Sequence, residues 1–67
     1  MNAVSISPRE KEVLTLVADG KTSAEIAAVL GISYHTASGI KERLKVKFEV
    51  YKETALIAAA FRRGVLS

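Results

Sequence analysis

Side chains that could recognise nucleic acid gather on one face of residues 34–48. A helix over this range has an apolar stripe at i, i+3, i+7 and i+11, made of Ala37, Ile40, Leu44 and Phe48. Its free face could meet base edges in a major groove, while cations on its flanks reach phosphates. That face presents Tyr34, His35, Ser38, Gly39, Glu42 and Lys45, and the flanking cations are Lys41, Arg43 and Lys47.

The positive charge of the chain is concentrated in this helix. Ten Lys and Arg residues oppose seven Asp and Glu residues, which gives a modest net charge of +3. The cations of residues 41–47 are interrupted by a single acid, Glu42. An ordinary solvated helix face is the alternative interpretation of these charges, and only their place in the predicted fold favours nucleic acid.

The elements that must position this face are four helices in one all-α domain over residues 1–67. We expect them at about residues 8–19, 23–30, 34–48 and 52–63. Ser7, Pro8 and Glu10 predict a capped first helix, and Thr22 with Glu25 repeats the same capping box.

The turn Leu30-Gly31-Ile32-Ser33 joins the second and third expected helices in the layout of a helix-turn-helix. Ser33 is the expected N-cap of the third helix. Its C-terminal end is marked less clearly, because Glu49 stands where Gly or Asn is preferred. The break is therefore expected to rest on Val50 and Tyr51 turning inward.

The expected fourth helix carries more apolar residues than one narrow stripe needs. We predict that its second apolar side contacts another copy of the chain in a homodimer. The alternative is that Ala supplies helix propensity and both sides meet the same core. The predicted interface consists of Leu56, Ile57, Ala59, Ala60 and Phe61.

Composition argues against several other classes of protein. The chain has no Cys, and its single His, His35, has no second metal ligand at helical spacing, so neither a metal nor a cofactor is expected. It has no nucleophile–base pair or phosphate-binding glycine loop, which argues against an enzyme. No run approaches the roughly 20 apolar residues of a membrane span, and residues 1–7 lack a secretory signal, so a cytoplasmic protein is expected.

Several segments together resemble the LuxR/GerE-type helix-turn-helix domain. They are Ile6–Leu14, the central stretch Val17–Ala27, the turn Leu30–Ser33, Thr36 at the start of the recognition helix, and Arg63–Leu66. The resemblance implies a four-helix fold that binds double-stranded DNA as a dimer, and it allows a contact with RNA polymerase.

The resemblance also assigns roles to individual positions. Ser38, Gly39 and Glu42 occupy the usual base-reading positions, although Ser38 replaces a cation and Glu42 introduces a carboxylate. The other predicted contacts are mostly with phosphates. The full predicted DNA-binding set is Lys21, Thr22, Ser23, Ser33, Tyr34, His35, Thr36, Ser38, Gly39, Lys41, Glu42, Lys45 and Lys47.

Three functions are compatible with this pattern. The first is a sequence-specific DNA-binding regulator, or its C-terminal effector domain. The second is a small LuxR-like interaction module, an antiactivator that binds DNA weakly, which the unusual residues at positions 38, 39 and 42 keep open. The third is the promoter-recognising C-terminal region of a sigma factor, which usually lacks a helix equivalent to residues 52–63.

Overall fold

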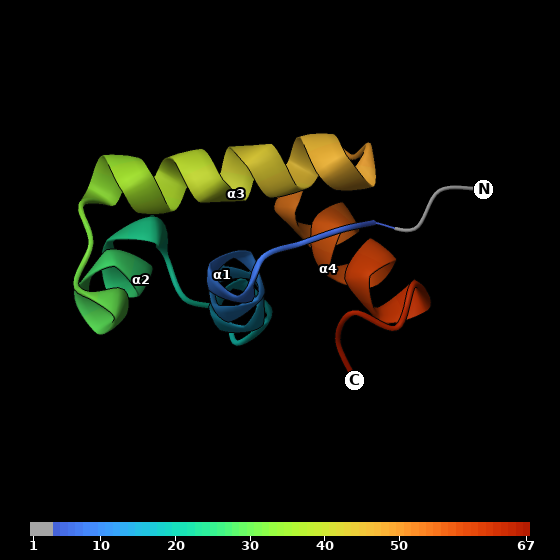
Figure 1. Ribbon diagram of the computed structural model, residues 1–67, viewed down its shortest axis with the longest axis horizontal. Helices are drawn as coiled ribbons and strands as arrows, with labels where there is room; N and C mark the ends of the chain where they lie inside the picture. The colour runs from blue at the N-terminus through green and yellow to red at the C-terminus, as the bar shows by residue number, and fades with distance from the viewer. Residues whose placement is uncertain (1–3) are drawn as a thin grey trace.

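The third helix lies across the other three in the computed structural model, which describes residues 4–67 (Figure 1). The helices are α1 (Pro8–Ala18), α2 (Ser23–Leu30), α3 (Tyr34–Phe48) and α4 (Glu53–Arg62), and no strand occurs among the described residues. These bounds lie within one residue of the expected ranges. α2 packs under the N-terminal half of α3 and α4 under its C-terminal half, with α1 between them (Figure 1).

The first two helices begin with complete capping boxes. The Ser7 hydroxyl accepts a hydrogen bond from the backbone N–H of Glu10 at 3.1 Å, and the Glu10 carboxylate accepts one from the N–H of Ser7 at 2.8 Å. Thr22 and Glu25 exchange the equivalent bonds at 3.2 and 2.9 Å. Because four N–H groups at each helix start lack an intrahelical partner, these local bonds fix where α1 and α2 begin.

All four helices contribute to one core beneath α3. The apolar stripe predicted for α3 is buried, as are the inward residues of its neighbours. The segment after α4 folds back over that helix, where the backbone N–H of Leu66 donates to the carbonyl of Ala60 at 3.2 Å. The buried apolar residues are Val13, Leu14, Val17, Ile26, Ala27, Ala37, Ile40, Leu44, Phe48, Leu56, Ala59, Ala60 and Leu66.

α3 ends through its backbone at Glu49, which adopts the left-handed conformation with φ 58°. The N–H of Val50 bonds to the carbonyl of Lys45 at 2.9 Å, which is the Schellman arrangement that commonly closes a helix. The expectation that Val50 and Tyr51 both turn inward is wrong for Tyr51, whose side chain is 95% exposed. The backbone turn itself ends the helix, so no inward anchor at Tyr51 is needed.

Residues 4–67 provide neither a membrane-spanning helix nor a cluster of metal ligands. None of the helices described is both long and apolar enough to cross a lipid bilayer. Within the same residues, no cluster of three or more His, Cys, Asp or Glu side chains could hold a metal ion.

Candidate nucleic-acid interface

α2 and its turn hold α3 by one face and leave the opposite face open. Ile26 and Ala27 of α2 are buried in the core. Gly31 takes the left-handed conformation with φ 68°, and the N–H of Ile32 then donates to the carbonyl of Ala27 at 3.0 Å. A glycine suits this position because an ordinary side chain is strained at positive φ. The geometry is that of a helix-turn-helix in which α3 is the presented helix.

The start of α3 is occupied by bonds within the protein. The Ser33 hydroxyl accepts a hydrogen bond from the N–H of Thr36 at 3.0 Å and donates one to the Thr36 hydroxyl at 2.9 Å. The rings of Tyr34 and His35 lie edge to face with centroids 5.7 Å apart. Both aromatic side chains are exposed, so they remain accessible to a ligand.

The outward face of α3 includes the three positions predicted to read bases. Gly39 and Glu42 are exposed and Ser38 is half-buried. A Cβ added at Gly39 would meet no atom within 4 Å, so packing inside this protein does not require a glycine there. A surface that approaches α3 closely from outside would benefit from the missing side chain.

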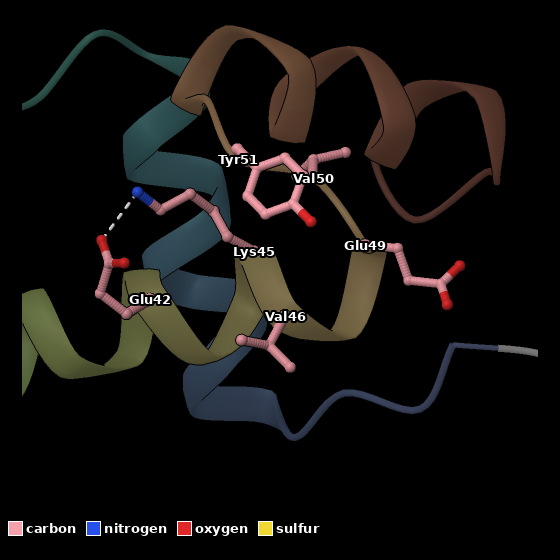
Figure 2. A pocket seen from close by; sticks show the side chains of 6 residues that line it. All are labelled: Glu42, Lys45, Val46, Glu49, Val50 and Tyr51. Carbon is pink, nitrogen blue, oxygen red and sulfur yellow. Dashed lines mark ion pairs between the residues drawn. The ribbon is translucent and has the colours of Figure 1, made fainter.

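Two lysines of α3 are engaged by carboxylates on the same side of the helix. The Lys41 ammonium lies 2.6 Å from the Glu53 carboxylate of α4, and the Lys41 side chain is only 13% exposed. The Lys45 ammonium lies 2.7 Å from the Glu42 carboxylate one turn earlier (Figure 2). Both lysines were predicted to contact phosphates, and in this structure each must leave a protein carboxylate to do so.

Lys47 joins α3 to α1 and to the segment that precedes α1. Its ammonium donates to the Glu10 carboxylate and to the carbonyl of Ser5, both at 2.9 Å. The Lys47 hydrogen bond, followed by the Ser7 backbone bond, lowers the pKa of Glu10. This predicted phosphate-contacting lysine is therefore part of the scaffold in the structure.

Arg43 is the most exposed of the α3 cations that form ion pairs. Its guanidinium lies 3.8 Å from the Glu10 carboxylate, and its side chain is 61% exposed. Arg43 was predicted to lie on the flank of the helix but is not in the predicted DNA-binding set. Its exposure makes it better placed for a phosphate than Lys41.

The start of α2 supplies a second group of polar residues. Lys21 and Thr22 are exposed and Ser23 is half-buried, and the Thr22 hydroxyl already accepts the capping bond from Glu25. Lys21 makes no ion pair among residues 4–67. Its charge is therefore available to an external anion.

Only part of the predicted dimer surface on α4 is accessible. Leu56, Ala59 and Ala60 are buried in the protomer core, where they pack toward α1, α3 and the returning C-terminal segment, so a second copy cannot reach them. Ile57 is half-buried and Phe61 is 48% exposed. The accessible apolar surface of α4 is thus formed by these two residues and exposed Ala58, with the polar residue Thr54 exposed on the same helix.

Sequence reasoning missed Val46, which is 76% exposed on α3. The core stripe of α3 was complete without Val46, and an apolar residue is not ordinarily considered for the polar, outward face of a helix. The usable signal was its position four residues after Glu42, on the face opposite that stripe.

The chain is similar to bacterial transcription regulators. The model of the family described as bacterial regulatory proteins, luxR family, matches residues 4–60. The chain is 38% identical over 65 residues to the quorum-sensing regulator RhlR of Pseudomonas aeruginosa, covering 97% of this chain and 27% of that protein. It is 36% identical to the regulatory protein SdiA of Escherichia coli, covering 94% of this chain and 26% of SdiA. The chain therefore spans about a quarter of the length of these relatives.

Two solved structures have the same helical arrangement. A Vibrio cholerae VqmA dimer without its target DNA superposes with a TM-score of 0.86 at 39% identity, over 91% of this chain and 28% of that one. A VqmA–ligand–DNA complex gives a TM-score of 0.85 at 38% identity, over 96% of this chain and 28% of that one.

Proposed function

Because the chain belongs to the luxR family of bacterial regulatory proteins, we propose that it binds duplex DNA as a sequence-reading domain of a transcription regulator. It is a regulator domain and not an enzyme. The observation that carries the proposal is the presentation of α3: one face is buried against α1, α2 and α4, and the other is open along the whole helix. A helix of this kind fits the major groove.

In the proposed complex, base edges and phosphates are met by different residues. Ser38, Gly39 and Glu42 face the bases. Lys21 and Arg43 contact phosphates on either side of the groove. Their charged groups are more accessible than those of Lys41 and Lys45. Lys45 joins them when it exchanges the Glu42 carboxylate for a phosphate.

A homodimer through α4 is the proposed active form. Two copies of a helix-turn-helix domain contact two half-sites when the distance between their recognition helices matches one helical turn of DNA. Half-buried Ile57 and exposed Phe61 supply the apolar part of the contact. VqmA, which is similar to this chain in structure, is a dimer. The proposed place of action is the bacterial cytoplasm, where a contact with RNA polymerase would complete regulation.

A specific observation also favours a second function, the protein-interaction module. The charges of Lys41, Lys45 and Lys47 are balanced by protein carboxylates, and Val46 and Tyr51 leave apolar surface exposed. A domain built this way could bind DNA weakly and act through a protein partner instead. The match to the luxR family argues against the third alternative, the C-terminal region of a sigma factor.

Fluorescence anisotropy against a random duplex library and a selected duplex, at two salt concentrations, distinguishes the two functions. With about three phosphate contacts per protomer, the log–log salt slope should be about −3 per protomer. Arg43→Ala and Lys21→Ala should weaken binding to all duplexes alike, whereas Arg62→Ala at the far end of α4 is the matched control. Absence of binding at low salt would contradict the DNA-binding proposal and favour the interaction module.

A further inference from the structure

One exposed apolar side chain lies on the outermost line of α3. That line runs at i, i+4, i+7 and i+11, opposite the buried stripe, through His35, Gly39, Glu42 and Val46. Val46 is its apolar member, and 76% of its side chain is exposed. Exposed apolar side chains are ordinary when scattered, but this one continues a line of residues that faces the proposed ligand.

The surroundings of Val46 do not suit a phosphate. Val46 borders a hollow of about 420 Å³ at the C-terminal end of α3, lined by Glu42, Lys45, Val46, Glu49, Val50 and Tyr51 (Figure 2). Glu42 and Glu49 bring carboxylates to this region, and Glu49 makes no ion pair within residues 4–67. Lys45 is already paired with Glu42. The isopropyl group of Val46 can form no hydrogen bond with a phosphate, and the Glu49 carboxylate, unpaired within residues 4–67, would repel one, so a groove-floor contact fits Val46 better than a backbone contact.

The major groove displays one apolar group, the C5 methyl of thymine. We infer that Val46 is a specificity-determining residue whose isopropyl group contacts this thymine methyl. The inference rests on the proposed function, because it requires α3 to lie in the groove. It adds an apolar contact to the polar readout predicted for Glu42, whose carboxylate can accept a hydrogen bond from the cytosine amino group.

The spacing along α3 limits where the thymine must lie. Glu42 and Val46 are four residues apart, which corresponds to about 6 Å along a helix. Successive bases of one strand are about 3.4 Å apart along the DNA axis. The thymine therefore lies within about two base pairs of the position that depends on Glu42.

A protein partner is the other possible occupant of this surface, and the arrangement favours DNA. Val46 and Tyr51 line the same hollow, and Lys45 lies between their side chains in Figure 2, so the apolar surface at this end of α3 is interrupted by a charged side chain. Val46 is instead continuous with Glu42 on the outward line of α3. A partner that covered Val46 would also cover Glu42 and compete with DNA.

The test removes the methyl group from the DNA and the isopropyl group from the protein. A preferred duplex is first selected from a random library with the unmodified protein, and each thymine is then replaced singly by deoxyuridine, which lacks only the C5 methyl. In each half-site, one of these single replacements should weaken binding about three- to fivefold, which is the effect expected for one buried methyl-sized group. Val46→Ala should abolish this sensitivity, and its exposed position leaves the core intact.

Val29→Ala, at an exposed valine on α2, is the matched control and should retain the deoxyuridine effect. Two results would overturn the inference while leaving DNA binding in place: a parent protein indifferent to every replacement, or a Val46→Ala variant with the same sensitive position as the parent. Failure to select any duplex would overturn the inference together with the proposed function. A protein partner that competes with DNA only when Val46 is present, with no deoxyuridine effect, would assign the surface to protein docking.

Discussion

The Lys47 ammonium lies 2.9 Å from the carboxylate of Glu10, an α1 residue whose exposed fraction is 3%. These residues are 37 positions apart in the chain, and their contact fastens the C-terminal part of α3 to the start of α1. The same carboxylate completes the capping box with Ser7. A single buried acid thus fixes both the beginning of one helix and the placement of another.

Glu10→Gln should destabilise the fold by about 1–3 kcal/mol at pH 7, because the charge-assisted bond to Lys47 is lost. The pKa of Glu10 is lowered, first by the Lys47 hydrogen bond and then by the Ser7 backbone bond. Its stabilising contribution is therefore present above the unfolded-state pKa and lost as the pH falls through the lower folded-state pKa.

Urea unfolding measured between pH 7 and pH 3 checks this prediction. The unmodified protein should lose stability with acid, and the Glu10→Gln variant should lose less. Glu12→Gln is the matched control, because Glu12 is exposed and pairs with Arg9 at 3.5 Å on the surface. Its effect should stay below about 1 kcal/mol. Equal pH profiles for the parent and Glu10→Gln would contradict the role given to Glu10.

Glu53→Gln should strengthen binding to every duplex by about three- to tenfold, the scale of one added phosphate contact. The change releases Lys41 from its 2.6 Å ion pair and lets the ammonium turn toward DNA. Anisotropy titrations in a double-mutant cycle with Lys41→Met isolate this effect. If Glu53→Gln strengthens binding equally without Lys41, the gain comes from removing a negative charge and not from the released lysine.

Glu42→Ala should relax the preference at one base position by about 1–3 kcal/mol, because the groove loses a hydrogen-bond acceptor. Affinity for unrelated duplexes should rise only slightly, as Lys45 is freed from its 2.7 Å partner. Competition against duplexes with every single base change measures both effects. A preference that survives the substitution unchanged would remove Glu42 from the base-reading residues.

The interaction module leads to a different expectation for the same position. In that case Glu42→Lys should create tight DNA binding where the parent shows little, since a repulsive charge has become attractive. A parent that already binds DNA tightly would argue against this alternative.

Phe61→Glu should prevent self-association through α4 while preserving the fold, because Phe61 is 48% exposed and outside the buried core. Analytical ultracentrifugation, alone and with DNA, measures the oligomeric state. Circular dichroism should show an unchanged helix content. Ala60→Glu is a contrasting variant: Ala60 is fully buried, so the charge should unfold the domain instead of merely dissociating it.

The fold was predictable from the sequence because its signals are local. Each capping box links residues only three positions apart, and the apolar stripe of α3 repeats at helical spacing. The candidate site was predictable only in part. Which residues face outward followed from periodicity, but the pairing of Lys47 with Glu10 joins distant parts of the chain and has no sequence signal.

The α4 surface illustrates the same limit. Periodicity alone could not distinguish burial in the protomer from burial against another copy. The difference depends on contacts between distant parts of the chain: α4 packs against α1 and α3, and the C-terminal segment returns to it through the bond from the Leu66 N–H to the Ala60 carbonyl. Leu56, Ala59 and Ala60 were therefore assigned to an interface although the protomer buries them itself.

α4 differs from the other helices at its N-cap, the residue just before the helix. Ser7, Thr22 and Ser33 each cap a helix with a side-chain oxygen, whereas Lys52 supplies no side-chain bond to the start of α4. Amide protons in the first turn of α4 should consequently exchange with deuterium faster than those in the first turns of its neighbours, since local opening breaks fewer bonds there. A second copy seated on α4 would slow that exchange, so assembly and the local order of this helix would be thermodynamically linked.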